Sequence, residues 1–207
     1  MTEPPSERKA RFDQLFAANP DPWDIDTSDY ERGKREAVLA ALGKQRFARM
    51  LEVGCAGGAL TERLAKFANS FVALDVSTKA IELAARRLHR CDSIEFVVAE
   101  VPDYWPKGQF DAVILSEVLY FLSVGEIRQV SQLARESLTG NGLCLLVNWI
   151  GTNDLPVDGD AAVLLLDPAI AVDAGECFDQ GGLAVIDMAR GTDDDAAALA
   201  QIRVACE

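Results

Sequence analysis

Two acidic residues and a group of glycines occupy positions where a nucleotide-like cofactor could bind. Glu52 ends an apolar run, the turn Gly54–Gly58 follows it, and Asp75 ends the next apolar run, FVALD. A strand, a glycine turn, a helix, a second strand and an acid form a layout that binds adenosine-bearing cofactors at the carboxyl ends of parallel strands. Glycines in the turn allow the backbone to approach such a ligand closely.

The spacing of these glycines differs from that of a dinucleotide site. Gly54, Gly57 and Gly58 do not form the G-x-G-x-x-G pattern. A carboxylate at Glu52 also suits a cation or an amino group better than a phosphate. The predicted cofactor is therefore S-adenosyl-L-methionine, which carries positive sulfonium and ammonium groups, with S-adenosyl-L-homocysteine as its product.

The residues expected to bind this cofactor lie mainly at strand ends. Asp75 would accept hydrogen bonds from the ribose hydroxyls, and Glu100 and Val101 would lie beside the adenine. The alternative is that both acids are solvated residues at the ends of strands. Cys55 is expected to be a small neutral residue of the turn, because no partner that would activate its thiol is evident. The full predicted set is Trp23, Tyr30, Glu52, Gly54, Cys55, Ala56, Gly57, Asp75, Val76, Glu100, Val101 and Ser116.

The predicted catalytic residues follow the fourth parallel strand, where catalytic groups cluster in open α/β sheets. Glu117 could orient an amine or a hydroxyl that accepts the methyl group of the cofactor, or it could take the proton of that group. Tyr120 could place its ring or its hydroxyl near the sulfonium. The alternative is that Glu117 caps a helix and Tyr120 packs in the core. His89 is the only histidine and ends a predicted helix away from the strand ends, so no histidine base is expected.

Short apolar runs alternate with amphipathic segments, which predicts an α/β fold. The expected architecture is a Rossmann-like, doubly wound, seven-stranded and mostly parallel sheet, with an antiparallel last strand and helices on both faces. The expected strands are 49–53, 71–76, 94–100, 110–116, 143–149, 170–172 and 183–188. The expected helices are 30–43, 58–68, 77–88, 124–138, 158–166 and 193–205, with a glycine turn at 140–142.

Residues 1–43 are expected to form an N-terminal helical cap or lid, and residues 44–207 the methyltransferase domain, within one domain of ordinary size. Trp23 and Tyr30 could cover the cofactor, and Lys34 follows Tyr30 by one helical turn. The alternative is that this helix simply packs on the sheet.

Composition excludes several classes of partner. The chain of 207 residues has a net charge of −13, and residues 151–207 alone hold 12 acids and 2 bases. An acidic chain without a basic stripe binds nucleic acids and anionic membranes poorly. The five scattered cysteines have no C-x-x-C spacing, which favours free thiols in the cytoplasm over a zinc or other metal site. The oligomeric state is not predicted.

With these residues in hand, the chain resembles the class I S-adenosylmethionine-dependent methyltransferases, through Glu52–Gly58 and Asp75. The segments NPDPW, LEVGCAGGALTERLA and SEVLYFL resemble more narrowly the nodulation protein S family, over about residues 19–150. That resemblance implies methylation of an amine, as in the deacetylated chitooligosaccharides that this family modifies. The acceptor is therefore expected to be a small molecule or an oligosaccharide.

Three other functions stay open from the sequence. An O-methyltransferase acting on a small metabolite would need a base, for which Glu117 is the obvious residue. A non-catalytic protein could bind S-adenosylmethionine without turnover. A nicotinamide-dependent oxidoreductase is disfavoured by the missing glycine pattern.

Overall fold

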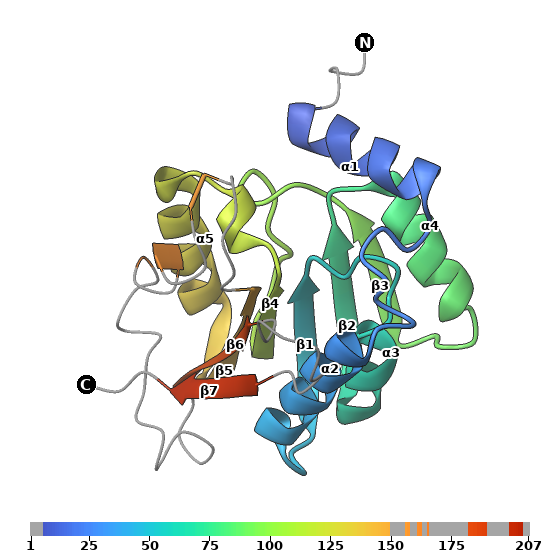
Figure 1. The fold of residues 1–207 in the computed structure, drawn as a ribbon. Coiled ribbons are helices and arrows are strands. Elements are labelled where there is room, and N and C mark those ends of the chain that lie inside the picture. The colour runs from blue at the N-terminus through green and yellow to red at the C-terminus, as the bar shows by residue number, and fades with distance from the viewer. Residues whose placement is uncertain are drawn as a thin grey trace.

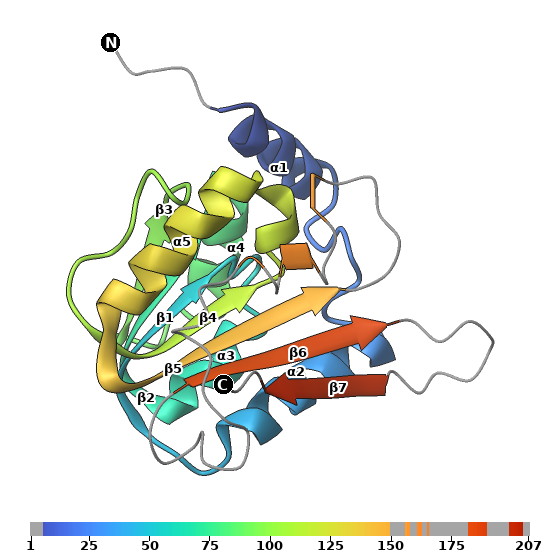
Figure 2. The ribbon, with the colours of Figure 1, turned by 90° about the vertical axis from the view of Figure 1, so that its left-hand side faces the viewer.

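The computed structural model of the chain describes residues 6–149, 156–157, 161–162, 165, 182–189 and 199–204. Its strands are β1 (Phe47–Val53), β2 (Ala68–Asp75), β3 (Ile94–Val98), β4 (Phe110–Ser116), β5 (Leu138–Trp149), β6 (Gly182–Ala189) and β7 (Leu199–Val204). They form one sheet in the order β3-β2-β1-β4-β5-β6-β7 (Figures 1 and 2). All neighbouring pairs are parallel except β6 and β7, which are antiparallel. The predicted α/β class with a mostly parallel sheet is confirmed.

Helices cover both faces of this sheet (Figure 1). They are α1 (Glu7–Ala18), α2 (Asp29–Leu42), α3 (Thr61–Leu64), α4 (Thr78–Arg87) and α5 (Val124–Ser137), with 3-10 turns η1 (Ala65–Phe67) and η2 (Leu119–Phe121). On one face α5 packs against the strands through Ile127 and Val130. On the other face α2, α3 and α4 contribute Val38, Leu64 and Ile81 to a second core. Helix α1 lies outside α4, which it contacts through Phe12 and Phe16.

Local signals in the sequence set the starts of the long helices. The hydroxyls of Ser28, Ser77 and Ser123 each accept a hydrogen bond from a backbone N–H in the first turn of α2, α4 and α5. In α5 the Glu126 carboxylate also accepts a hydrogen bond from the backbone N–H of Ser123, which completes a capping box. These caps satisfy N–H groups that have no partner inside a helix.

Among the described residues, three predictions of secondary structure are wrong: two helices and one turn. The helix expected over 58–68 contains only α3 and η1, because Ala68 already pairs with Phe47 at the start of β2. The turn expected at 140–142 lies within β5, where the pairing with β4 shifts register between Phe110 and Ala112. The helix expected over 193–205 is replaced at 199–204 by β7, which pairs with the backbone groups along the edge of β6.

The remaining predictions for the C-terminal quarter are only partly tested. The strand expected at 170–172 and most of the helix expected at 158–166 lie outside the described residues. Within the described part of the chain, no helix is long and apolar enough to cross a membrane.

A close contact between two turns gives a test of this fold. A Cβ atom at Gly54 would lie 2.4 Å from the carbonyl oxygen of Ser116, and Gly54 has a φ of +84°. We expect Gly54→Ala to lower the free energy of unfolding by more than about 3 kcal/mol, because both strain and overpacking oppose the methyl group. Gly125→Ala is the control: nothing lies within 4 Å of its Cβ position in α5, so a gain of about 0.5–1 kcal/mol is expected. Urea denaturation measures both, and equal effects would contradict the contact.

Candidate functional site

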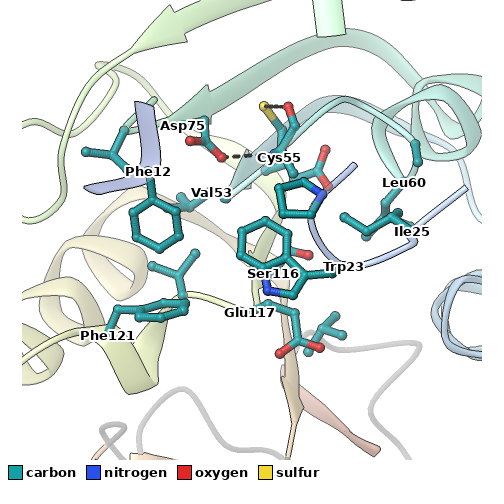
Figure 3. A pocket seen from close by; sticks show the side chains of 18 of the residues that line it. Phe12, Trp23, Ile25, Val53, Cys55, Leu60, Asp75, Ser116, Glu117 and Phe121 are labelled. Atoms are coloured by element: carbon teal, nitrogen blue, oxygen red, sulfur yellow. Dashed lines mark hydrogen bonds between the residues drawn. The ribbon is translucent and has the colours of Figure 1, made fainter. Parts of the chain in front are cut away.

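A cavity of about 670 Å³ opens at the carboxyl ends of β1, β2 and β4. It lies where the strand order reverses between β1 and β4, the usual position of ligand sites in open α/β sheets. In Figure 3, Asp75 and Glu117 lie apart, with the rings of Phe12, Trp23 and Phe121 around the space between them. The predicted site residues that line it are Trp23, Tyr30, Glu52, Gly54, Cys55, Ala56, Asp75, Val76, Glu100, Val101, Ser116, Glu117 and Tyr120. Gly57 lines a smaller neighbouring pocket instead, facing Leu83.

The glycine turn is held in place by the end of β2. The backbone N–H groups of Gly54 and Cys55 both donate to the carbonyl oxygen of Leu74, at 2.8 and 3.1 Å. The carboxylate of Asp75 accepts from the N–H of Ala56 at 2.9 Å and from that of Ser77 at 2.8 Å. Asp75 therefore fixes the turn and the start of α4, and each of its oxygens still has a lone pair for a ligand.

Burial changes the ionisation of the acids on the cavity floor. Burial raises the pKa of Asp75 to about 6, although the two backbone donors oppose this rise. Glu52 is completely buried, and burial together with the nearby charge of Asp75 raises its pKa to about 8, against the opposing hydrogen bond from Thr61. Both carboxyls are thus easier to protonate than exposed ones.

One carboxylate oxygen of Glu52 lacks a hydrogen-bond partner in the described part of the chain. The hydroxyl of Thr61 donates to its Oε2 at 2.6 Å, whereas Oε1 is buried and has no hydrogen-bond partner among the described residues. Buried polar atoms are nearly always satisfied, so a free oxygen at a cavity floor points to a missing partner. A positively charged ligand group fits this position.

Cys55 and His89 are two further side chains that could carry acid–base or nucleophilic chemistry. Burial, and then the charges of Asp75 and Glu52, raise the pKa of the Cys55 thiol well above its usual value, so the thiol stays protonated. His89 is exposed at the end of α4 and does not line the cavity. In the part of the chain that the structure describes, no cluster of three potential metal-ligating side chains occurs.

Glu117 is the centre of a group of paired side chains. Its Oε1 accepts from the ammonium of Lys34 at 2.7 Å, and its Oε2 accepts from the backbone N–H of Trp149 at 3.0 Å. The Tyr120 hydroxyl also donates to Oε2. Lys34 makes a second ion pair with Glu31 at 2.8 Å. Burial disfavours the charge on Lys34, but Glu117 and Glu31 outweigh it and raise the pKa of Lys34 above its usual value.

Helix α1 covers the other side of the cavity. Arg8 forms ion pairs with Glu100 at 2.5 Å and with Glu126 at 3.0 Å, and Ser6 donates to the same Glu100 carboxylate. The ring of Phe12 packs edge-on against Phe121, with 5.0 Å between the ring centroids. The Glu100 carboxylate, predicted to contact the adenine, is therefore already bound to α1.

Sequence reasoning missed several residues of this cavity. Arg8, Phe12, Phe121 and Trp149 line it but were not predicted, and Lys34 was noticed only as a neighbour of Tyr30. Phe12, Leu15 and Phe16 recur in the sequence at the spacing of one helical face, but that pattern fits simple packing equally well. No sequence pattern indicates the pairing of Lys34 with Glu117, which lies 83 positions away.

Comparison with known proteins identifies related chains. The family model of Nodulation protein S (NodS) matches residues 5–136. Nodulation protein S from Rhizobium tropici is 38% identical over 127 residues, which cover 59% of this chain and 53% of that protein. The chain thus matches about half the length of such curated relatives.

Two crystal structures have the same fold. The N-methyltransferase NodS from Bradyrhizobium japonicum WM9, in complex with S-adenosyl-L-homocysteine, has a TM-score of 0.74 and 23% identity, covering 96% of this chain and 99% of that one. A candidate methyltransferase from Pseudomonas syringae has a TM-score of 0.61 and 33% identity, and the match covers 70% of this chain and 88% of that one.

The buried Glu52 predicts a pH-dependent stability. Between pH 4.5 and pH 8 the carboxyl loses its proton in the unfolded chain but keeps it in the folded one. The free energy of unfolding therefore falls as the pH rises through this window. We expect Glu52→Gln to match wild type near pH 4.5 and to be several kcal/mol more stable at pH 8, measured by urea denaturation. Glu82→Gln, at an exposed acid, is the control. If the difference in unfolding free energy between Glu52→Gln and wild type did not change with pH, Glu52 would ionise as an exposed acid does.

Proposed function

The chain belongs to the Nodulation protein S (NodS) family, and we propose that it is an S-adenosylmethionine-dependent methyltransferase acting on an amine nitrogen. The observation that carries this proposal is the cavity at the reversal point of the sheet, with an acid at the end of each of β1 and β2 and a third acid just after β4. The family membership and the shared fold support it.

We propose the following placement of the cofactor. The Gly54–Ala56 turn would lie against its amino-acid part, and the free oxygen of Glu52 would face its positive charges. Asp75 and Val76 would contact the ribose, and the backbone of Val101 the adenine. The cofactor itself supplies an activated methyl group bonded to sulfur.

The N-terminal segment is proposed to be a lid. Residues 1–43 would cover the cofactor bound by residues 44–207, with Phe12 and Trp23 over the cavity and Tyr30 beside the transferred methyl. The ion pairs of Arg8 with Glu100 and Glu126 would hold α1 closed. A closed cavity excludes water and strengthens electrostatic interactions within it.

The charges in the cavity favour an amine over a hydroxyl acceptor. A hydroxyl must lose its proton to react, but the carboxylate of Glu117 already receives three hydrogen bonds. Burial, followed by the charge of Glu117, raises the pKa of Tyr120 well above its usual value, so its phenolate is not an available base. A neutral amine reacts directly: its lone pair bonds to the methyl carbon, the carbon–sulfur bond breaks, and sulfur keeps the electron pair. The product ammonium then loses a proton to water.

The acceptor is proposed to be a small molecule or saccharide that carries a free amine. The structurally similar NodS from Bradyrhizobium japonicum is an N-methyltransferase, and the family resemblance implies a deacetylated chitooligosaccharide. Calorimetric titration with S-adenosyl-L-homocysteine and with NADH tests the cofactor. Assays with deacetylated chitooligosaccharides, other amines and matched alcohols then test the acceptor. Binding of NADH alone would overturn the proposal, and transfer only to alcohols would replace the amine by a hydroxyl.

Replacing Asp75 tests the proposed ribose contact. We expect Asp75→Asn to weaken S-adenosyl-L-homocysteine binding by about 1.5–3 kcal/mol, because hydrogen bonds to a charged acceptor are lost. Asparagine keeps one acceptor oxygen, so one of the two backbone N–H groups that now donate to Asp75 keeps its partner, and the fold of the variant is checked by urea denaturation. The control is Asp111→Asn. Asp111 lies away from the cavity and accepts a hydrogen bond from the backbone N–H of Arg49. Unchanged affinity in a folded Asp75→Asn variant would remove Asp75 from the cofactor site.

Replacing Arg8 tests the lid. We expect Arg8→Gln to weaken cofactor binding by about 1–3 kcal/mol, since it breaks two partly buried ion pairs. Limited proteolysis should then cut the segment before residue 43 faster than in wild type. Lys79→Gln removes an exposed ion pair on α4 and should change neither measurement. Equal cleavage in wild type and Arg8→Gln would show that these ion pairs do not hold α1.

A further inference from the structure

Lys34 connects the N-terminal segment to the predicted acceptor end of the cavity. Its ammonium lies between two carboxylates, 2.8 Å from Glu31 and 2.7 Å from Glu117, and its side chain is only 12% exposed. Tyr120 and the backbone N–H of Trp149 complete the environment of Glu117. The group thus joins α2, the turn after β4, and the end of β5.

We propose that Lys34 is a positioning residue of the acceptor site: through Glu117, it fixes the Tyr120 hydroxyl so that only its lone pairs remain for the acceptor. This inference rests on the proposed function and adds a residue that the sequence did not assign to the site. Lys34 itself would not touch the reacting atoms.

The count of protons in the group supports this role. A tyrosine hydroxyl has one proton, and Tyr120 donates it to Glu117. The phenol oxygen can then only accept a hydrogen bond. Lys34 uses two of its three N–H donors on Glu31 and Glu117, and its ammonium lies 5.7 Å from the centre of the Tyr30 ring. An acceptor that donates an N–H therefore fits this end of the cavity, and one that presents only oxygen lone pairs does not.

The backbone places this group beside the cofactor turn. Glu117 has a left-handed φ of 56°, and its N–H donates to the carbonyl oxygen of Val147 at 2.9 Å. The preceding residue, Ser116, is so close to Gly54 that no Cβ fits between them. The Glu117 side chain therefore leaves a turn that packs directly against the glycine turn.

The charge of the group suits methyl transfer to nitrogen. Glu31, Lys34 and Glu117 carry a formal net charge of −1 and all line the cavity. The amine nitrogen becomes positive as its bond to the methyl carbon forms. Fixed negative charge near a developing positive charge stabilises the transition state more than the neutral reactant.

Substitutions that remove or keep the charge of Lys34 test the proposal. We compare wild type, Lys34→Met, Lys34→Arg and Arg32→Met, the last removing a 61% exposed cation from the same helix. Methyl transfer to a deacetylated chitooligosaccharide and binding of S-adenosyl-L-homocysteine are measured for each. Lys34→Met should lower kcat by about 100-fold, the scale expected when a reacting group is misplaced, and retain cofactor affinity. Lys34→Arg should restore most of kcat, and Arg32→Met should resemble wild type.

A second measurement does not depend on the acceptor. The tyrosine Raman doublet distinguishes a donating phenol from an accepting one, and subtracting the spectrum of Tyr120→Phe isolates Tyr120. In the S-adenosyl-L-homocysteine complex, we expect a donating Tyr120 in wild type and Lys34→Arg, and a weaker donor in Lys34→Met. If Lys34→Met does not fold, the double variant Glu31→Gln/Lys34→Met is used in its place. The double variant leaves only Glu117 charged in this group, whereas Lys34→Met leaves both Glu31 and Glu117 without their cation.

The outcomes separate this inference from the proposed function. An unchanged Tyr120 signal in Lys34→Met, an unchanged kcat, or a parallel loss of cofactor binding would each overturn the positioning role. If wild type methylates no amine but binds S-adenosyl-L-homocysteine, the amine assignment fails, and the Raman comparison still decides whether Lys34 fixes Tyr120.

Discussion

The contact between Gly54 and the carbonyl oxygen of Ser116 is the constraint on which the cavity depends. The two turns follow neighbouring strands, β1 and β4, at the point where the strand order reverses. The backbone of Ser116 and the side chain of Val118 both lie against Gly54, so the two turns are in direct contact. The glycine turn and Glu117 are thereby fixed to each other, so that a cofactor bound on one side and an acceptor bound on the other would meet in a set geometry.

The acids in this cavity show how far environment, rather than residue type, determines chemistry. Glu52 is buried with one free oxygen, and its pKa rises to about 8. Asp75 is also buried, but two backbone N–H groups limit the rise of its pKa to about 6. Glu117 is paired with Lys34 and accepts two further hydrogen bonds. The unpartnered oxygen of Glu52 leaves room for a positive ligand group, whose charge would favour the ionised carboxylate. Asp75 holds the glycine turn, and Glu117 holds the Tyr120 hydroxyl in place.

The sequence predicts the parts of the structure that follow from local rules. Glu52, Asp75 and Glu117 could be placed at one edge of the sheet because parallel strands bring their carboxyl ends together. The pairings of Arg8 with Glu100 and of Lys34 with Glu117 could not, since they join positions 92 and 83 residues apart and no periodicity marks them. The same difference explains the error at residues 199–204: the aspartates at 193–195 resemble a helix start, whereas pairing with the edge of β6 is a non-local interaction.

In the proposed reaction, the protein does not need to remove a proton before the methyl group moves. Among the described residues that line the cavity, each acid near the acceptor end is engaged, Glu31 and Glu117 with Lys34. The fraction of neutral amine would then be set by the acceptor and the solution, and the protein would act on position and charge. An arrangement without a free base discriminates against hydroxyl acceptors, which cannot react until their proton is taken. The same ion pairs that hold α2 against the end of the sheet would thus also set the choice of nitrogen over oxygen.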